Sequence, residues 1–183
     1  MDTVEGEFDP ERFSRWVAYV LRHNPSRYGL EPDRYGYVDL EAFLRIARRR
    51  YAARPLEQLR ALLEASAERF EMTHSRLRAR YGHSIAAEPV GPPVEPPEQL
   101  YHGTDAARIE SIRAAGLTPI DRRMLHLSDT AEEALHIAQR RSPQPAVWRV
   151  LARDAASDGV AFYREHRVYL TEHLPPRFLA LEA

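Results

Sequence analysis

Apolar residues recur at helical spacing in three segments of the first half of the chain. The first segment begins after Asp9 and Pro10, a typical N-cap and first-turn pair, and a second helix is predicted after Asp39. A third helix is predicted from about Pro55. The apolar positions of the three are, in order, Phe13, Trp16, Val17, Val20 and Leu21; Leu40, Phe43, Leu44 and Ala47; Leu56, Leu59, Leu62, Leu63 and Phe70.

Residues 69–84, RFEMTHSRLRARYGHS, contain two short extended stretches around a polar turn at His74–Ser75. Three helices followed by a hairpin predict a winged-helix module. Five of the twelve residues at 86–97, AAEPVGPPVEPP, are proline, which favours a stiff and extended spacer. We therefore expect one domain at residues 1–85, a linker at 86–97 and a second domain at 98–183.

Short strands and helices alternate in the second half. Two helices are predicted, one over 105–116 with Gly116 at its C-terminal end and one over about 130–141. The class is α+β, and the phosphate-binding signatures GxGxxG and GxxxxGK[ST] are absent from the sequence. The candidate strands are 100–103, 125–128, 146–152, 159–163 and 167–171.

The composition, 44% hydrophobic and 29% charged, is that of a soluble globular protein, and no apolar run is long enough to cross a membrane. The absence of cysteine excludes disulfides and fits a cytoplasmic location. Residues 1–85 hold 15 arginines against 13 acidic residues, which leans toward an anionic partner. All 26 basic residues are arginine. GC-rich coding explains this usage, yet any phosphate site here must use bidentate guanidinium groups.

Basic and small polar residues gather at two places in the first domain. Arg22 and His23 lie at the end of the first predicted helix, where cations also interact favourably with the helix dipole. Arg76, Arg78 and Arg80 alternate with apolar residues, which places three guanidinium groups on one strand face. A solvated hairpin face is the simpler alternative for that alternation. His83 and Ser84 follow immediately, after Gly82.

Similar side chains end two strands of the second domain. His102, Gly103 and Thr104 end the first strand, and glycine there permits a ligand to approach the backbone closely. His126 and Ser128 end the next strand, although a serine before a helix is usually an N-cap.

Two other uses of these residues find little support. The spacing of histidines and carboxylates indicates no metal site, and a GxSxG nucleophile motif is missing.

The ordered motifs resemble the family of RNA/tRNA 2′-phosphotransferases (KptA/Tpt1) from about Phe13 to Leu179. The matching segments are FSRWVAYVLRHNP, GLEPDRYGYVDLEAFL, RFEMTHSRLRARYGHS, LYHGT, HLS, the helix ending at Arg140, and FYREHRVYLTEHLPPRFL. The resemblance implies an N-terminal winged-helix lobe and a C-terminal ADP-ribosyltransferase-like lobe.

The resemblance also implies a catalytic group of Arg22, His23, Arg78 and Arg140. Arg141 is an alternative to Arg140, because the sequence QRRSPQP lacks the family's glycine-containing turn. Tyr81 stands where the family usually has glutamine. The residues expected to bind NAD⁺ are His102, Gly103, Thr104, His126 and Ser128, and those expected to bind substrate are His83 and Ser84.

The implied activity is removal of an internal RNA 2′-phosphate with NAD⁺ as co-substrate and without a metal. The RNA 2′-phosphate attacks the anomeric carbon of NAD⁺ and nicotinamide leaves. A ribose hydroxyl of the resulting 2′-phospho-ADP-ribosylated RNA then attacks the phosphate, and ADP-ribose 1″,2″-cyclic phosphate is released. Two alternatives remain: an ADP-ribosyltransferase acting on nucleic-acid terminal phosphates or protein, and a non-catalytic winged-helix nucleic-acid-binding protein. A monomer is expected.

Overall fold

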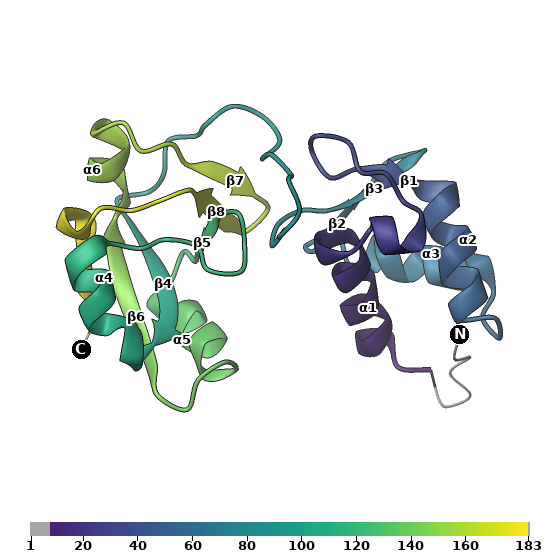
Figure 1. Ribbon diagram of the computed structural model, residues 1–183, viewed down its shortest axis with the longest axis horizontal. Coiled ribbons are helices and arrows are strands. Elements are labelled where there is room, and N and C mark those ends of the chain that lie inside the picture. The colour runs from purple at the N-terminus through teal and green to yellow at the C-terminus, as the bar shows by residue number, and fades with distance from the viewer. Residues whose placement is uncertain (1–7, 183) are drawn as a thin grey trace. The chain divides into compact units, whose positions relative to one another are not determined.

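Three helices form most of the regular secondary structure in the first unit of the computed structural model, which describes residues 8–182 (Figure 1). They are α1 (Pro10–His23), α2 (Leu40–Arg50) and α3 (Leu56–Ala65). The predicted cap at Asp9 is confirmed, because its carboxylate accepts from the Glu11 amide at 2.8 Å. The second helix begins after Asp39 as predicted, and the Asp39 carboxylate accepts from the Ala42 amide at 2.7 Å. The apolar faces predicted for α1 and α2 are buried in one core.

A small antiparallel sheet completes this unit. Its strands are β1 (Val38–Asp39), β2 (Phe70–Met72) and β3 (Arg76–Ala79), in the order β1-β3-β2, and a short 3₁₀ helix, η1, spans Ser26–Tyr28. The predicted hairpin is confirmed. The assignment of Phe70 to the third helix is wrong, because α3 ends at Ala65 and a turn, closed by the Phe70 amide on the Ser66 carbonyl at 3.0 Å, leads into β2.

The second unit contains two three-stranded antiparallel sheets (Figure 1). One has the order β4-β6-β9 and the other the order β5-β8-β7. Their bounds are β4 (Gln99–Asp105), β5 (Leu125–Leu127), β6 (Pro145–Leu151), β7 (Tyr163–Glu165), β8 (Val168–Thr171) and β9 (Leu179–Leu181). The helices are α4 (Ile109–Ala115), α5 (Ala131–Gln139) and α6 (Ala152–Ser157), with 3₁₀ turns η2 (Ala106–Arg108) and η3 (Pro176–Phe178). The α+β class is confirmed.

The strand predicted at 159–163 is wrong for most of its length. Helix α6, which the pattern did not reveal, ends just before it, and the amide of Gly159 bonds to the Ala156 carbonyl at 3.0 Å. The amide of Val160 bonds to the Ala155 carbonyl at 2.9 Å. These two residues therefore terminate a helix, with Gly159 in the left-handed region at φ +94°, and β7 begins only at Tyr163.

The proline-rich segment is divided between the two units, which meet in the chain at Glu88 and Pro89. The Glu88 amide donates to the Arg34 carbonyl at 2.8 Å within the first unit. The Val94 amide donates to the Phe162 carbonyl at 2.7 Å within the second. Backbone hydrogen bonds thus hold parts of this segment against the unit on each side. Within residues 8–182, no helix combines the length and apolarity needed to span a bilayer.

Candidate active site

The segment after β3 lies against the C-terminal end of α1. The amides of Ser84 and Ile85 donate to the Arg22 carbonyl at 3.0 and 3.4 Å. Helix ends leave carbonyl groups without helical partners, and this segment supplies donors for one of them. The contact brings Arg22 and His23 beside residues about sixty positions later in the chain.

Arg22 is held by two neighbours from that segment. Its guanidinium carbon lies 5.2 Å from the centre of the Tyr81 ring, a cation–π distance. A Cβ at Gly82 would come within 3.3 Å of the Arg22 Cδ, Nε and Cζ atoms, and Gly82 has φ +87°. Glycine at 82 therefore provides both the backbone conformation and the room for the guanidinium. The aromatic ring at 81 is in contact with a candidate catalytic residue.

Arg78 is buried in an ion pair, so the solvated-face alternative is wrong for this residue. Its side chain is 2% exposed, and its Nε and Nη2 atoms lie 2.9 and 2.6 Å from Glu71 Oε2. Arg80 Nη1 reaches the same oxygen at 3.1 Å. Arg76 differs from both, because it is exposed and pairs with Asp33 at 3.4 Å.

The sequence motifs did not identify Glu71 as a site residue, although the predicted hairpin already implied its position. The turn predicted at His74–Ser75 places Glu71 directly opposite Arg78, and the observed register has that pairing. Burial alone raises the pKa of Glu71, but the hydrogen bond and charge of Arg78 outweigh it and hold that pKa below its usual value. Tyr37 also hydrogen-bonds to the Glu71 carboxylate and lies in cation–π contact with Arg78. Glu71 is therefore an ionised acceptor that joins two arginines and a phenol.

His83 lies among these cations and is neutral. Its side chain is 9% exposed, and burial, followed by the charges of Arg22, Arg78 and His23, lowers its pKa to about 4. Within residues 8–182, its Nε2 atom is buried without a hydrogen-bond partner. The structure thus brings Arg22, His23, Arg78, His83 and Ser84 into one cluster in the first unit.

The titration of His83 predicts acid sensitivity of the fold. Between its ordinary pKa of 6.5 and the folded value of about 4, the unfolded chain binds a proton that the folded chain does not. Stability is therefore lost as the pH falls through this window, and His83 contributes about 3 kcal/mol of that loss.

Urea unfolding from pH 7 to 4 should show a smaller loss of unfolding free energy for His83→Gln than for the wild type. His74→Gln, at an exposed position in the hairpin turn, is the matched control and should keep the wild-type slope. Parallel curves for the wild type and His83→Gln would contradict the prediction.

A second group of predicted residues lies where β4 and β5 meet. Tyr101 and Ser128 exchange two backbone hydrogen bonds of 2.9 and 2.8 Å, and His102 Nδ1 lies 3.0 Å from the His126 carbonyl oxygen. Burial lowers the pKa of His102, so its ring is neutral. This contact brings together His102, His126 and Ser128.

Ser128 and Gly103 both have structural roles in this group. Ser128 is not an N-cap: Thr130 caps α5 instead, its hydroxyl accepting from the Glu133 amide at 3.2 Å, and Ser128 is buried in the bridge to β4. Packing explains why residue 103 is glycine, because a Cβ there would lie 2.0 Å from the Ala134 carbonyl oxygen of α5. Thr104 is half-buried on β4, opposite Ala146.

Arg140 and Arg141 are both exposed at the end of α5. The helix ends at Gln139, two residues before the predicted end at about 141, and Arg140 is its C-cap. Arg140 belongs to the second unit, whereas Arg22, His23 and Arg78 belong to the first.

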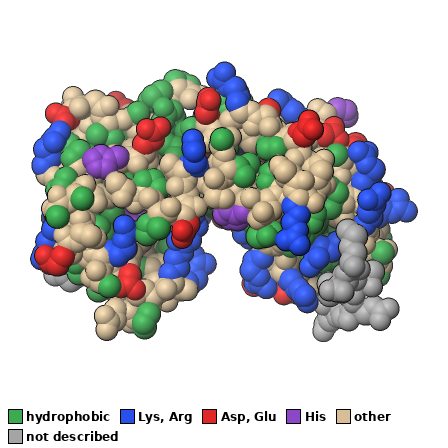
Figure 2. All heavy atoms as spheres, in the orientation of Figure 1, with side chains coloured by type: hydrophobic (Ala, Val, Ile, Leu, Met, Phe, Trp, Pro, Cys, Tyr) green, Lys and Arg blue, Asp and Glu red, His purple; other side chains and the backbone are tan. Residues whose placement is uncertain are grey.

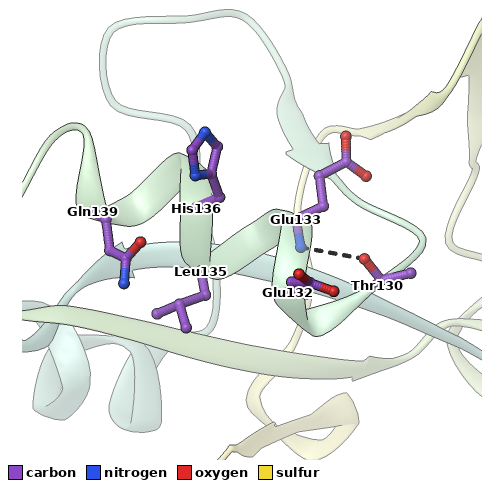
Figure 3. A pocket seen from close by; sticks show the side chains of 6 residues that line it. All are labelled: Thr130, Glu132, Glu133, Leu135, His136 and Gln139. Atoms are coloured by element: carbon purple, nitrogen blue, oxygen red, sulfur yellow. Dashed lines mark hydrogen bonds between the residues drawn. The ribbon is translucent and has the colours of Figure 1, made fainter.

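A hollow of about 410 Å³ lies along α5 (Figure 3). It is lined by Thr130, Glu132, Glu133, Leu135, His136 and Gln139. These six include two glutamates and no arginine, and none is a predicted site residue, so the hollow is poorly suited to a phosphate. Among residues 8–182, no three histidine, aspartate or glutamate side chains are grouped so that they could hold a metal ion.

Two arginines and two histidines thus lie together where β3 and the segment after it meet the end of α1. Comparison with known proteins identifies the class. Residues 9–173 match the model of the RNA 2′-phosphotransferase, Tpt1 / KptA family, and the chain belongs to this family. It is 36% identical over 171 residues to a probable RNA 2′-phosphotransferase of Lacticaseibacillus paracasei, covering 92% of this chain and 91% of that protein. Probable RNA 2′-phosphotransferases of Acetivibrio thermocellus (36%, 95% and 98% covered) and Streptomyces coelicolor (37%, 94% and 95%) are similar over comparable spans.

Proposed function

We propose that this chain is an NAD-dependent enzyme that removes an internal 2′-phosphate from RNA. The observation that carries the proposal is the cluster of Arg22, His23, Arg78 and His83 at the junction of α1 and the hairpin. The guanidinium of the half-buried Arg22 matches the oxygens of a phosphate, and the buried Arg78 adds positive charge to the cluster. The neutral His83 adds a polar contact without adding charge. Arginine side chains are also spread over the visible face of this unit, which favours approach of a polyanion (Figure 2).

The first unit, in this proposal, is a winged-helix lobe that binds the RNA phosphate. Its three helices and small antiparallel sheet have the composition of that module. Arg22 and Arg78 neutralise the charge of the phosphate. Arg140, or Arg141 beside it, stays a candidate catalytic residue. The phosphate then keeps a defined orientation, which is the main requirement for attack on an anomeric carbon.

The second unit is, in the same proposal, an ADP-ribosyltransferase-like lobe that binds NAD⁺. The group at the junction of β4 and β5 fits this ligand in its chemistry, because neutral imidazole and hydroxyl groups suit ribose hydroxyls and a carboxamide. His102 engages the His126 carbonyl through Nδ1, and its Nε2 lone pair would accept a hydrogen bond from a ribose hydroxyl. Gly103, Thr104 and Ser128 complete the proposed surface.

The proposed reaction consists of two group transfers, first of ADP-ribose to the 2′-phosphate and then of the phosphate to a ribose hydroxyl. A 2′-phosphate oxygen forms a bond to the anomeric carbon as the glycosidic bond to nicotinamide breaks, and nicotinamide leaves with the electron pair. A ribose hydroxyl of the ADP-ribosyl group then forms a bond to phosphorus and loses its proton. The bond from phosphorus to the RNA 2′-oxygen breaks, and that oxygen takes up a proton. The products are RNA with a 2′-hydroxyl, nicotinamide and ADP-ribose 1″,2″-cyclic phosphate.

The test is an assay with an oligoribonucleotide carrying one radiolabelled internal 2′-phosphate, with and without NAD⁺. We expect the label to move into ADP-ribose 1″,2″-cyclic phosphate only when NAD⁺ is present. Arg22→Ala should lose this transfer, whereas Arg27→Ala, at an exposed arginine of η1, should keep it. Accumulation of ADP-ribosylated RNA would favour the one-step transferase. RNA binding without release of nicotinamide would favour the non-catalytic alternative.

A further inference from the structure

Ser84 lies within hydrogen-bond distance of both His23 and the helix end. Its Oγ is 2.9 Å from His23 Nδ1 and 3.5 Å from the Arg22 carbonyl oxygen. The backbone of the same residue is anchored by its amide, which donates to the Arg22 carbonyl at 3.0 Å. Tyr19, one turn earlier on α1, faces the His23 ring with 6.2 Å between the ring centres. The imidazole is therefore held from two sides.

The single hydroxyl proton of Ser84 has two acceptors within reach. The Arg22 carbonyl already accepts from two backbone amides, those of Ser84 and Ile85, and its oxygen lies at the outer limit of hydrogen-bond distance from Oγ. The Nδ1 lone pair of a neutral His23 lies 0.6 Å nearer, at 2.9 rather than 3.5 Å. Donation to Nδ1 is therefore the stronger of the two, and a ring that accepts at Nδ1 carries its proton on Nε2.

We propose that Ser84 is a positioning residue that selects the Nε2–H tautomer of His23. The Nε2 atom then carries a proton in the neutral ring and in the imidazolium alike. His23 meets the RNA 2′-phosphate as a hydrogen-bond donor in both states and does not act as a general base. The part that concerns the phosphate rests on the proposed function, whereas the choice of tautomer is a property of the protein alone.

The tautomer is measured directly by long-range ¹H–¹⁵N correlation spectra of the ¹⁵N-histidine-labelled protein, at a pH where the ring is neutral. The His23 signals are assigned by their loss in His23→Gln. We expect the Nε2–H pattern in the wild type and in Ser84→Thr, which keeps the hydroxyl. Ser84→Ala should give a mixture of tautomers, and Ser26→Ala, at a nearby exposed serine, should leave the wild-type pattern. The Nδ1–H pattern in the wild type, or an unchanged pattern in Ser84→Ala, would overturn the proposal.

Kinetics provides the second readout. With the 2′-phosphorylated RNA and NAD⁺, Ser84→Ala should lower kcat by about tenfold, the effect of one hydrogen bond of ordinary strength, with little change in the KM for NAD⁺. Ser84→Thr should restore the rate, which a general loss of packing would not allow. An equal rate in Ser84→Ala and the wild type would contradict the positioning role. If the wild type does not transfer the phosphate at all, the proposed function fails, and the spectra still decide the tautomer.

Discussion

Gly103→Ala is expected to unfold the second unit, at a cost of about 4 kcal/mol or more. The added Cβ would lie 2.0 Å from the carbonyl oxygen and 2.9 Å from the carbonyl carbon of Ala134. Both are backbone atoms of α5, so no side-chain rotation relieves the contact. Either the helix moves away from β4 or the strand distorts, and both changes expose core residues. Thermal unfolding followed by circular dichroism measures the effect.

Gly159→Ala is the matched control for this substitution. Gly159 has φ +94° and nothing within 4 Å of a Cβ, so alanine there should cost only about 1–2 kcal/mol of backbone strain. Ala138→Gly should not rescue Gly103→Ala, because it removes only the Cβ at 3.0 Å and leaves the backbone contact. A Gly103→Ala protein as stable as the Gly159→Ala control would mean that α5 does not pack this closely on β4.

Glu71→Ala is expected to destabilise the first unit by about 3 kcal/mol. The substitution leaves the buried Arg78 guanidinium without its carboxylate, and breaking one side of a buried ion pair is costly. The carboxylate is 28% exposed, so water replaces part of the lost interaction and the effect falls at the lower end of the usual range. Glu71→Gln should cost less, because the amide oxygen still accepts a hydrogen bond. Urea unfolding at pH 7 gives the free energies.

Glu64→Ala provides the comparison for an exposed pair. Glu64 lies 3.7 Å from Arg60 on the surface of α3, and surface ion pairs contribute little. The change in unfolding free energy should stay within about 0.5 kcal/mol. Equal effects of the two substitutions would show that burial of Arg78 does not make its pairing with Glu71 important to the fold.

The two arginines of the cluster therefore differ as experimental probes. Arg78 is tied to Glu71 in the interior, and its replacement alters stability together with any catalytic role. Arg22 is held by the Tyr81 ring and the Gly82 backbone at the end of a helix. Loss of activity in an Arg22 variant that remains folded is thus the clearer sign of a role in catalysis.

Local chemistry explains why much of the fold was predictable. Asp9 and Asp39 bond to amides two and three residues away, so a cap can be read from a short stretch of sequence. The hairpin turn likewise depends on neighbouring residues, and its predicted centre already implied the pairing of Glu71 with Arg78. The prediction of a strand at 159–163 was wrong because it also relied on local pattern alone. An apolar run of five residues is compatible with a strand, but Gly159 and Val160 donate backbone hydrogen bonds that terminate α6.

The sequence by itself determined the α+β class, the three N-terminal helices, the hairpin and membership of the RNA 2′-phosphotransferase family. Periodicity, caps and the order of motifs are properties of nearby residues, and they can be read along the chain. Only the tertiary structure decided that Arg78 is buried, that His83 is neutral and that Ser84 contacts His23. It also decided that Gly103 faces the backbone of α5. Each of these depends on contacts between residues far apart in the sequence, such as the 61 positions between His23 and Ser84, and burial and charge there follow from packing.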